Sequence, residues 1–279
     1  MALFINTNVA SLGAQRSLAT SGAELKTAME RLSSGKKINS AADDAAGFAI
    51  AERMTAQIRG LNMATKNAND GLSMLGVIEN ATNDVTDMLH RMRELAIQAT
   101  NDTNSDEDRA FLQLEVAQLK LEIDRVATDT QYNGQEVLAG GFTSKSIQVG
   151  TEANQTITFS VNGIKADAIG SVDDSAYVSG IDISNATDAQ AGLQVITDAI
   201  EQVAGDRATY GALQNRLEYT VSNLMNVAEF TTAARSRIED ADFAAESARL
   251  AKAQVLQQTG TAMLAQANAS SQLALSLIR

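Results

Sequence analysis

The sequence predicts a mainly α fold: a long coiled-coil-like helical rod with paired terminal helices and a small inserted β-hairpin element. Apolar residues recur at steps of three and four over long stretches, which is the periodicity of helices that pack side by side. The 279 residues include no Pro and only 4% aromatic residues, and this composition favours uninterrupted helices packed closely in thin bundles. Near the middle of the chain the period changes to two, as is typical of strands.

The first long helix is predicted from one apolar stripe in which every step is three or four residues. Its members are Leu61, Thr65, Ala68, Leu72, Leu75, Ile78, Thr82, Val85, Leu89, Met92, Ala96 and Ala99. The segment NDTNSD, residues 101–106, ends the pattern. Ser105 followed three residues later by Asp108 is typical of a capping box, so a second helix is predicted to begin there. Its apolar positions are Leu112, Val116, Leu119, Ile123 and Val126.

A third apolar stripe predicts another long helix in the second half of the chain. Thr187 with Gln190 indicates where this helix starts. The stripe consists of Leu193, Ile196, Ile200, Val203, Tyr210, Leu217, Val221, Leu224, Ala228 and Ile238. Because three stripes of similar character can cover one another, we expect the three helices to form one rod.

The β-hairpin element is predicted between the two helical halves. The triplet Tyr132-Asn133-Gly134 indicates a turn. Residues 146–149 and 156–161 alternate between polar and apolar side chains, and the intervening GTEANQ is suited to a hairpin loop. Ile147 and Val149 are expected on one face of the first strand, and Ile157, Phe159 and Val161 on one face of the second.

The two ends of the chain carry almost no charge, although the formal net charge is -12. Before Glu24 the only charged side chain is Arg16, and after Lys252 the only one is Arg279. A helix without a charged face is expected to be buried on nearly all sides, and one chain cannot supply that cover. We therefore predict that the ends become ordered and buried on assembly with other copies, through Leu3, Phe4, Ile5, Val9, Leu12, Leu256, Met263, Leu264, Leu273, Leu277 and Ile278.

The composition argues against several classes of function. The chain has no Cys and a single His, His90, so thiolate and histidine chemistry have little to work with. The negative charge disfavours nucleic acid and anionic membrane surfaces as partners, because both attract clustered Lys and Arg. We predict no enzyme activity, no cofactor and no metal site. The N-terminal MALFINTNVASLGAQR lacks the pattern of a secretory signal peptide.

Three long runs of sequence resemble bacterial flagellin. They are INTNVASLGAQRSLATSGAELKTAMERLSSGKKINSAADDAAGFAIAERM, GALQNRLEYTVSNL and SRIEDADFAAESARLAKAQVLQQTGTAMLAQANASSQLALSLIR. The resemblance implies a structural subunit of the extracellular flagellar filament, a helical homopolymer used for motility. It also implies type III export without a cleavable signal peptide, and an export chaperone and hook-associated junction and cap proteins as partners. Residues 132–184 are too few for large outer domains, so we identify a short member of the family.

The resemblance divides the chain into three parts. Residues 1–45 and 239–279 are expected to form a terminal-helix inner-core domain, residues 46–134 and 183–238 a helical rod domain, and residues 135–182 its β-hairpin element. Between the first two parts lies a connector with Asp43 and Asp44 on one strand of the chain and Glu239, Asp240, Asp242 and Phe243 on the other. Charge at a helix N-terminus, pairing with Arg235 and Arg237, or subunit contact would each explain these carboxylates.

A further resemblance concerns RMRELAIQA, residues 91–99, which is similar to the flagellin stretch recognised by a Toll-like innate immune receptor. The matching positions are Arg91, Leu95 and Glu115. Packing between subunits is the alternative role for these residues.

Two other functions compete with the filament subunit. A hook–filament junction protein of the same superfamily shares the terminal helices but forms a ring of few copies. An enzyme or adhesin built on a helical rod would need a pocket with a polar constellation or a larger distal domain.

Overall fold

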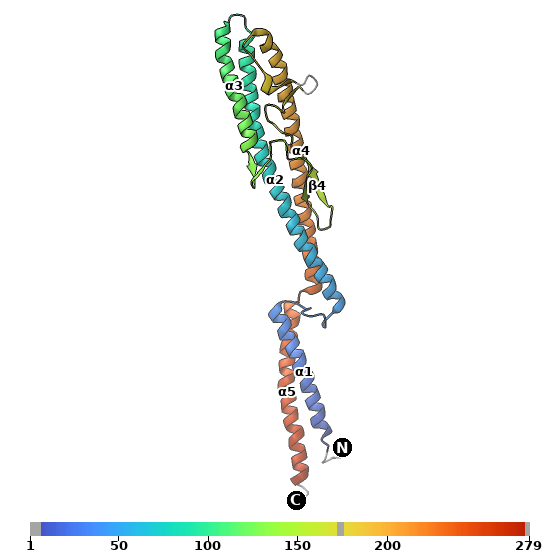
Figure 1. Ribbon diagram of the computed structural model, residues 1–279. Helices are drawn as coiled ribbons and strands as arrows, with labels where there is room; N and C mark the ends of the chain where they lie inside the picture. Colours follow the sequence, from blue (N-terminus) through green and yellow to red (C-terminus); the bar gives the residue numbers. More distant parts are fainter. Residues whose placement is uncertain (1–6, 172–175, 277–279) are drawn as a thin grey trace. The chain divides into compact units, whose positions relative to one another are not determined.

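Helices make up most of the chain in the computed structural model, which describes residues 7–171 and 176–276 (Figure 1). This confirms the mainly α fold class. The helices within these ranges are α1 Val9–Ser34, α2 Ala45–Ala99, α3 Asp106–Asp129, α4 Ala186–Glu239 and α5 Phe243–Ser276, with a short 3-10 helix at Val178–Gly180.

Contacts within the chain divide it into two compact units. Met1–Ile58 and Glu229–Arg279 form one unit, which we call the terminal unit, and Arg59–Ala228 forms the other, which we call the rod unit. The predicted domain boundaries after residues 45 and 238 stay a prediction, because they concern assembly rather than contacts within one chain.

The core of the rod unit is formed where α2, α3 and α4 lie side by side (Figure 1). The predicted stripe on α2 is confirmed: its members between 75 and 99 are fully buried or nearly so. Val116 and Ile123 of α3 and Ile196, Val203, Tyr210 and Leu217 of α4 join the same core. Each such aliphatic side chain contributes about 1.5–3 kcal/mol by leaving water. An ion pair between Arg207 and Glu79 (2.8 Å) links α4 to α2 at the edge of this core.

Three two-stranded antiparallel sheets lie in the described part of residues 131–177. They pair β1 Gln131–Tyr132 with β2 Gln135–Glu136, β3 Lys145–Gln148 with β4 Thr156–Phe159, and β5 Gly170–Ser171 with β6 Ala176–Tyr177. The predicted hairpin is β3–β4, with Ile147 opposite Ile157. Asn133 and Gly134 have positive φ at the β1–β2 turn, a conformation that Gly and Asn adopt most readily.

The capping box predicted for α3 is confirmed. Ser105 Oγ accepts a hydrogen bond from the Asp108 amide (3.2 Å), and the Asp108 carboxylate accepts one from the Ser105 amide (3.0 Å). The start predicted for α4 is wrong. The helix begins at Ala186, and Asn185 Oδ1 accepts a hydrogen bond from the Asp188 amide (2.8 Å). Asn caps a helix at least as well as Thr does, and Asn185 stands two residues before Thr187, so α4 begins two residues earlier than predicted.

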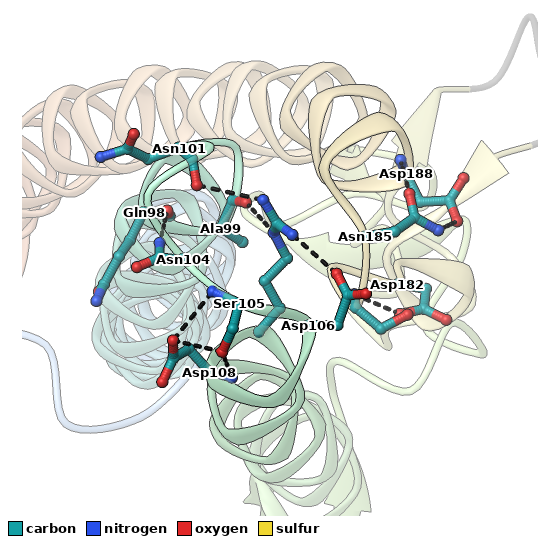
Figure 2. Close-up of polar contacts among 12 residues, drawn as sticks. Gln98, Ala99, Asn101, Asn104, Ser105, Asp106, Asp108, Asp182, Asn185 and Asp188 are labelled. Atoms are coloured by element: carbon teal, nitrogen blue, oxygen red, sulfur yellow. Dashed lines mark hydrogen bonds and ion pairs between the residues drawn. The ribbon is translucent and has the colours of Figure 1, made fainter.

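The turn between α2 and α3 is closed by a buried arginine, Arg109. Its guanidinium donates to the Ala99 carbonyl (2.8 Å), the Asn101 carbonyl (3.2 Å) and the Asp106 carboxylate (3.0 Å), and Figure 2 shows these three acceptors around one guanidinium group. The carbonyls at the end of a helix lack partners within the helix. Arg109 therefore satisfies the end of α2 and holds α3 against it.

Polar side chains of α3 form hydrogen bonds with the irregular segment that precedes α4. Asp124 accepts a hydrogen bond from the Ala166 amide (2.8 Å), and Gln113 accepts one from the Ile183 amide (2.9 Å). Lys120 donates to the carbonyls of Ser179 and Ile181, and its burial lowers the pKa of its ammonium group. These bonds explain how a segment with little regular structure stays packed on the helices.

A half-buried carboxyl, Asp206, lies beside the buried Tyr210 on α4. Asp206 Oδ1 accepts a hydrogen bond from Asn162 (2.7 Å), whereas Asp206 Oδ2 and the Tyr210 hydroxyl are buried without a hydrogen-bond partner among the described residues. Burial raises the pKa of Asp206. The folded protein thus binds this proton more tightly than the unfolded chain, so the stabilisation is present at low pH and is lost as pH rises through the folded-state pKa.

Replacing Asp206 with Asn should therefore stabilise the protein at neutral pH, by about 1 kcal/mol, because no buried charge remains unpaired. The advantage over the native chain should shrink as pH falls and the native Asp206 becomes neutral. Thermal unfolding followed by circular dichroism across this pH range measures both. Asp198→Asn on the same helix is the control, since Asp198 already accepts a hydrogen bond from Gln194 (2.8 Å). An advantage that is equal at all pH values would contradict the assignment.

Candidate functional site

The terminal helices α1 and α5 pair with each other in antiparallel orientation (Figure 1). Near the start of α1, the Asn8 side chain donates to the Ala267 carbonyl (2.9 Å), and the Ser11 hydroxyl donates to Asn268 Oδ1 (2.9 Å). Near its end, Arg31 forms an ion pair with Glu246 (3.7 Å). These contacts set the register of the pair.

The residues of α1 that face α5 follow a strict heptad spacing. They are Ser11, Ala14, Leu18, Ser21, Leu25, Ala28 and Leu32, which are buried or half-buried while their neighbours are mostly exposed. On α5 the corresponding residues are Glu246, Leu250, Ala253, Gly260, Leu264 and Ala267. Sequence reasoning missed this seam, although its signal, steps of three and four, was present. The small residues in the seam made it a weak apolar pattern.

Large residues of one helix meet small residues of the other along this seam. Leu18 packs over Gly260, where an added Cβ would lie only 3.1 Å from Leu18 Cδ1. In the same register Leu25 falls opposite Ala253, and Ala28 falls opposite Leu250. Close approach of the helix backbones follows, because each Leu occupies the space above a small residue.

The outward faces of α1 and α5 carry apolar side chains that no other described residue covers. Val9 is 67% exposed, Leu12 56% and Met263 64%, and Leu256, Met29 and Val255 are also exposed. Val9, Leu12, Leu256 and Met263 were among the predicted interface residues. Met29 and Val255 were missed because they lie among charged or polar neighbours.

The other predicted interface residues have different positions. Leu264 is half-buried in the seam and faces α1, so within one chain it serves the pairing of the two helices. Leu3, Phe4, Ile5, Leu277 and Ile278 lie outside the described residues, and Leu273 belongs to α5 but its side chain lies outside them.

The connector is rigidified by its carboxylates acting as caps. Asp44 Oδ1 accepts from the Ala46 (3.1 Å) and Gly47 (2.9 Å) amides at the start of α2, and Asp242 Oδ1 accepts from the Ala244 (2.9 Å) and Ala245 (3.2 Å) amides at the start of α5. The expected role of negative charge at a helix N-terminus is thus present at both positions. Phe243, at the first turn of α5, is exposed.

Asp43 organises the loop that enters α2. Its Oδ2 accepts hydrogen bonds from the amides of Ser40 (2.9 Å) and Asn39 (3.1 Å). These bonds, led by that from Ser40, hold the pKa of the Asp43 carboxyl below its usual range. The loop is therefore stabilised by the charged form of Asp43.

The two strands of the connector are joined by main-chain bonds. The Glu239 carbonyl accepts from the Lys37 amide (2.6 Å), and Lys36 forms a β-bridge with Asp240. Glu239 also pairs with Lys36 (2.5 Å) and more loosely with Arg235 (3.9 Å). The sequence led us to expect that the connector carboxylates pair with Arg235 and Arg237. Among the described ion pairs, the pair of Glu239 with Arg235 is the one that fits this expectation.

The three positions of the predicted receptor motif differ in exposure. Arg91 Nε lies 2.8 Å from the Glu115 carboxylate, and both side chains are exposed. Leu95 is only 2% exposed and belongs to the core of the rod unit. The structure brings Arg91 and Glu115 together and assigns Leu95 to packing within the chain.

Two properties of the described residues bear on other kinds of site. None of their helices combines the length and apolar character needed to cross a membrane. Their His, Asp and Glu side chains form no cluster of three or more that could hold a metal ion.

Both helical halves of the chain match family models. Residues 5–143 match the bacterial flagellin N-terminal helical region, and residues 193–278 match the bacterial flagellin C-terminal helical region. The chain is 41% identical over 287 residues to the flagellar filament 33 kDa core protein of Treponema phagedenis, and 40% identical over 277 residues to a flagellin of Halalkalibacterium halodurans. Each alignment covers 99% of this chain and 100% of the relative.

A solved structure shares the fold. A chain assigned as a flagellar hook-associated protein from Vibrio parahaemolyticus has a TM-score of 0.62 and 15% identity, with 71% of this chain and 100% of that chain covered.

The seam between α1 and α5 predicts the effect of enlarging Gly260. Gly260→Leu should force the side chain into Leu18 and destabilise the helix pair by about 1–3 kcal/mol. Limited proteolysis of the monomer, with circular dichroism, should show faster cleavage and lower helix content in the terminal unit. Gly13→Leu is the matched control, because a Cβ there meets no atom within 4 Å. Equal protection of the two variants would contradict the packing of Leu18 over Gly260.

Proposed function

Because the chain belongs to the bacterial flagellin family, we propose that it enters the filament by burying the outward faces of its paired terminal helices against those of other copies. The chain is a structural component of the extracellular flagellar filament that serves motility, and not an enzyme.

The observation that carries the proposal is the uncovered apolar face of the α1–α5 pair. Leu12 and Met263 remain exposed after the helices have covered each other's inner face. Burying one such side chain contributes about 1.5–3 kcal/mol, so several per copy supply a strong driving force for association. The described part of α5 after Lys252 carries no charge that would oppose burial.

The geometry of the contact also suits a filament rather than a closed pair. The face on α1 and the face on α5 are different surfaces, so a contact between the α1 face of one copy and the α5 face of the next is heterologous. Contacts of this kind repeat from copy to copy, and they generate a helical polymer when the rotation between copies does not close into a ring. The predicted interface residues Phe4 and Ile278 lie outside the described residues and stay a prediction.

A hook–filament junction protein is the second candidate, favoured by the fold shared with the chain assigned as a hook-associated protein. The relatives aligned over their full length carry the names of a flagellin and a filament core protein, which supports the filament subunit. Copy number separates the two candidates: electron cryo-microscopy of the polymerised chain should show long hollow filaments. Small closed rings would support the junction protein instead.

The remaining partners are proposals that follow from the family. They are an export chaperone, hook-associated junction and cap proteins, and type III export without a cleavable signal peptide. Recognition by a Toll-like receptor would use the exposed Arg91 and Glu115, with Leu95 acting through the packing of α2. Silence of receptor-expressing cells at a saturating dose of monomer would reject that proposal.

Truncating one exposed side chain of the terminal helices should weaken polymerisation selectively. Met263→Ala should raise the critical concentration for filament growth by about tenfold, because burial worth more than 1 kcal/mol is lost. Met225→Ala is the matched control, since Met225 on α4 is 58% exposed and lies in the rod unit. Filament mass sedimented from a concentration series measures both. If the two variants polymerised alike, the terminal helices would not be the dominant interface.

A further inference from the structure

The charged part of the α1–α5 pair contains a groove with an excess of positive charge. The groove has a volume of about 470 Å³ and lies between the second half of α1 and the first turns of α5. Arg31, Arg249 and Lys252 line it together with Glu24 and Glu246, which is three cations against two carboxylates. Its size lies in the range of pockets that hold ligands.

The cations of the groove are only partly neutralised within the chain. Glu246 is buried and lies 3.7 Å from Arg31 and 3.2 Å from Arg249. The Arg249 side chain is nevertheless 64% exposed. Lys252 takes part in none of the ion pairs formed by the described residues. The groove therefore presents at least two exposed cations to an incoming group.

The connector of the same unit presents the complementary charge. Asp43, Asp240 and Asp242 are exposed. Asp43 and Asp242 each use one carboxylate oxygen to accept from backbone amides, which holds the carboxylates in place and leaves the other oxygen available to a partner. The hydrogen bonds to Asp43 also lower its pKa and keep it ionised. Preorganised charges of this kind set the orientation of a partner.

We propose that the connector of one copy docks in the α1–α5 groove of a neighbouring copy, with Asp43, Asp240 and Asp242 facing Arg249 and Lys252. The inference rests on the proposed function, because it needs the chain to polymerise. A second copy is the occupant because both complementary surfaces belong to this chain, and none of the described ion pairs joins them within one copy. The two surfaces differ, so the contact is head to tail and can be repeated along a helical polymer.

The docking defines an axial register between neighbouring copies, which the apolar faces do not provide. Apolar burial is non-directional, so long apolar helices can slide past one another with little penalty. A pair of charged surfaces near the connector selects one axial register, because a shift brings like charges together. The charges lie at the end of the helix pair next to the connector, whereas the rest of the pair is almost uncharged.

The test uses two variants, each of which reverses one charge on one of the two surfaces. Lys252→Glu makes the groove acidic, and Asp240→Lys makes the connector more basic. Asp240 is chosen because its carboxylate caps no helix in the described hydrogen bonds. Each variant is mixed with sheared native filaments as seeds, and growth is measured at fixed ionic strength. Lys26→Glu is the matched control, since Lys26 is exposed on α1 but does not line the groove.

Each variant alone should show a critical concentration raised by about fivefold, because an attraction becomes a repulsion. An equal mixture should polymerise within about twofold of the native chain, because the carboxylate introduced at position 252 meets the ammonium group introduced at position 240, and the native groove accepts the native connector. Lys26→Glu should polymerise normally. Circular dichroism of each monomer should match the native spectrum.

Native growth of Lys252→Glu, or a mixture no better than either variant alone, would overturn the docking. Lys252→Gln gives a milder form of the same test and should fall between the native chain and Lys252→Glu. If Met263→Ala still impaired growth while the charge variants did not, the docking would fail and the proposed burial of the terminal helices would stand.

Discussion

A single partner helix can cover only one face of another helix, and each terminal helix of this chain has apolar residues on two. The α1–α5 seam covers the inner face, where Leu18 packs over Gly260 and the helices approach closely. The outer face, with Leu12 and Met263, stays exposed in the single chain. The most favourable way to cover it is a further copy, whose own outer face then needs the next. The helical polymer follows from this geometry, because no finite number of copies completes the cover unless the contacts close.

The rod unit solves the same problem within one chain. The stripe of α2 is covered by α3, by α4 and by the strands between them, so that its members from Leu75 to Ala99 are buried without any partner. Polar bonds complete the packing at the places where helices end, with Arg109 closing the α2–α3 turn. The rod unit therefore has a core of its own, whereas in the terminal unit only the inner faces of α1 and α5 are buried.

The connector is the charged part of the terminal unit. Asp44 caps the start of α2, and Asp242 caps the start of α5. A β-bridge between Lys36 and Asp240 joins the two strands of the connector. Charged residues gather there and around the adjoining groove, while the ends of the chain have almost none. Such a separation permits apolar burial to supply affinity and charge to supply direction.

Periodicity in the sequence determined the long helices, because a stripe such as Leu75 to Ala99 leaves no other way to bury its side chains. The capping box of Ser105 and Asp108 and the β3–β4 hairpin followed from local chemistry, and long motifs at both ends identified the family. The tertiary structure alone decided which apolar residues stay exposed. Leu264 and Leu256 look alike in sequence, yet the first faces α1 and the second faces outward. Register between α1 and α5 makes that difference, and it is set by contacts between residues about 250 positions apart, such as Ser11 and Asn268.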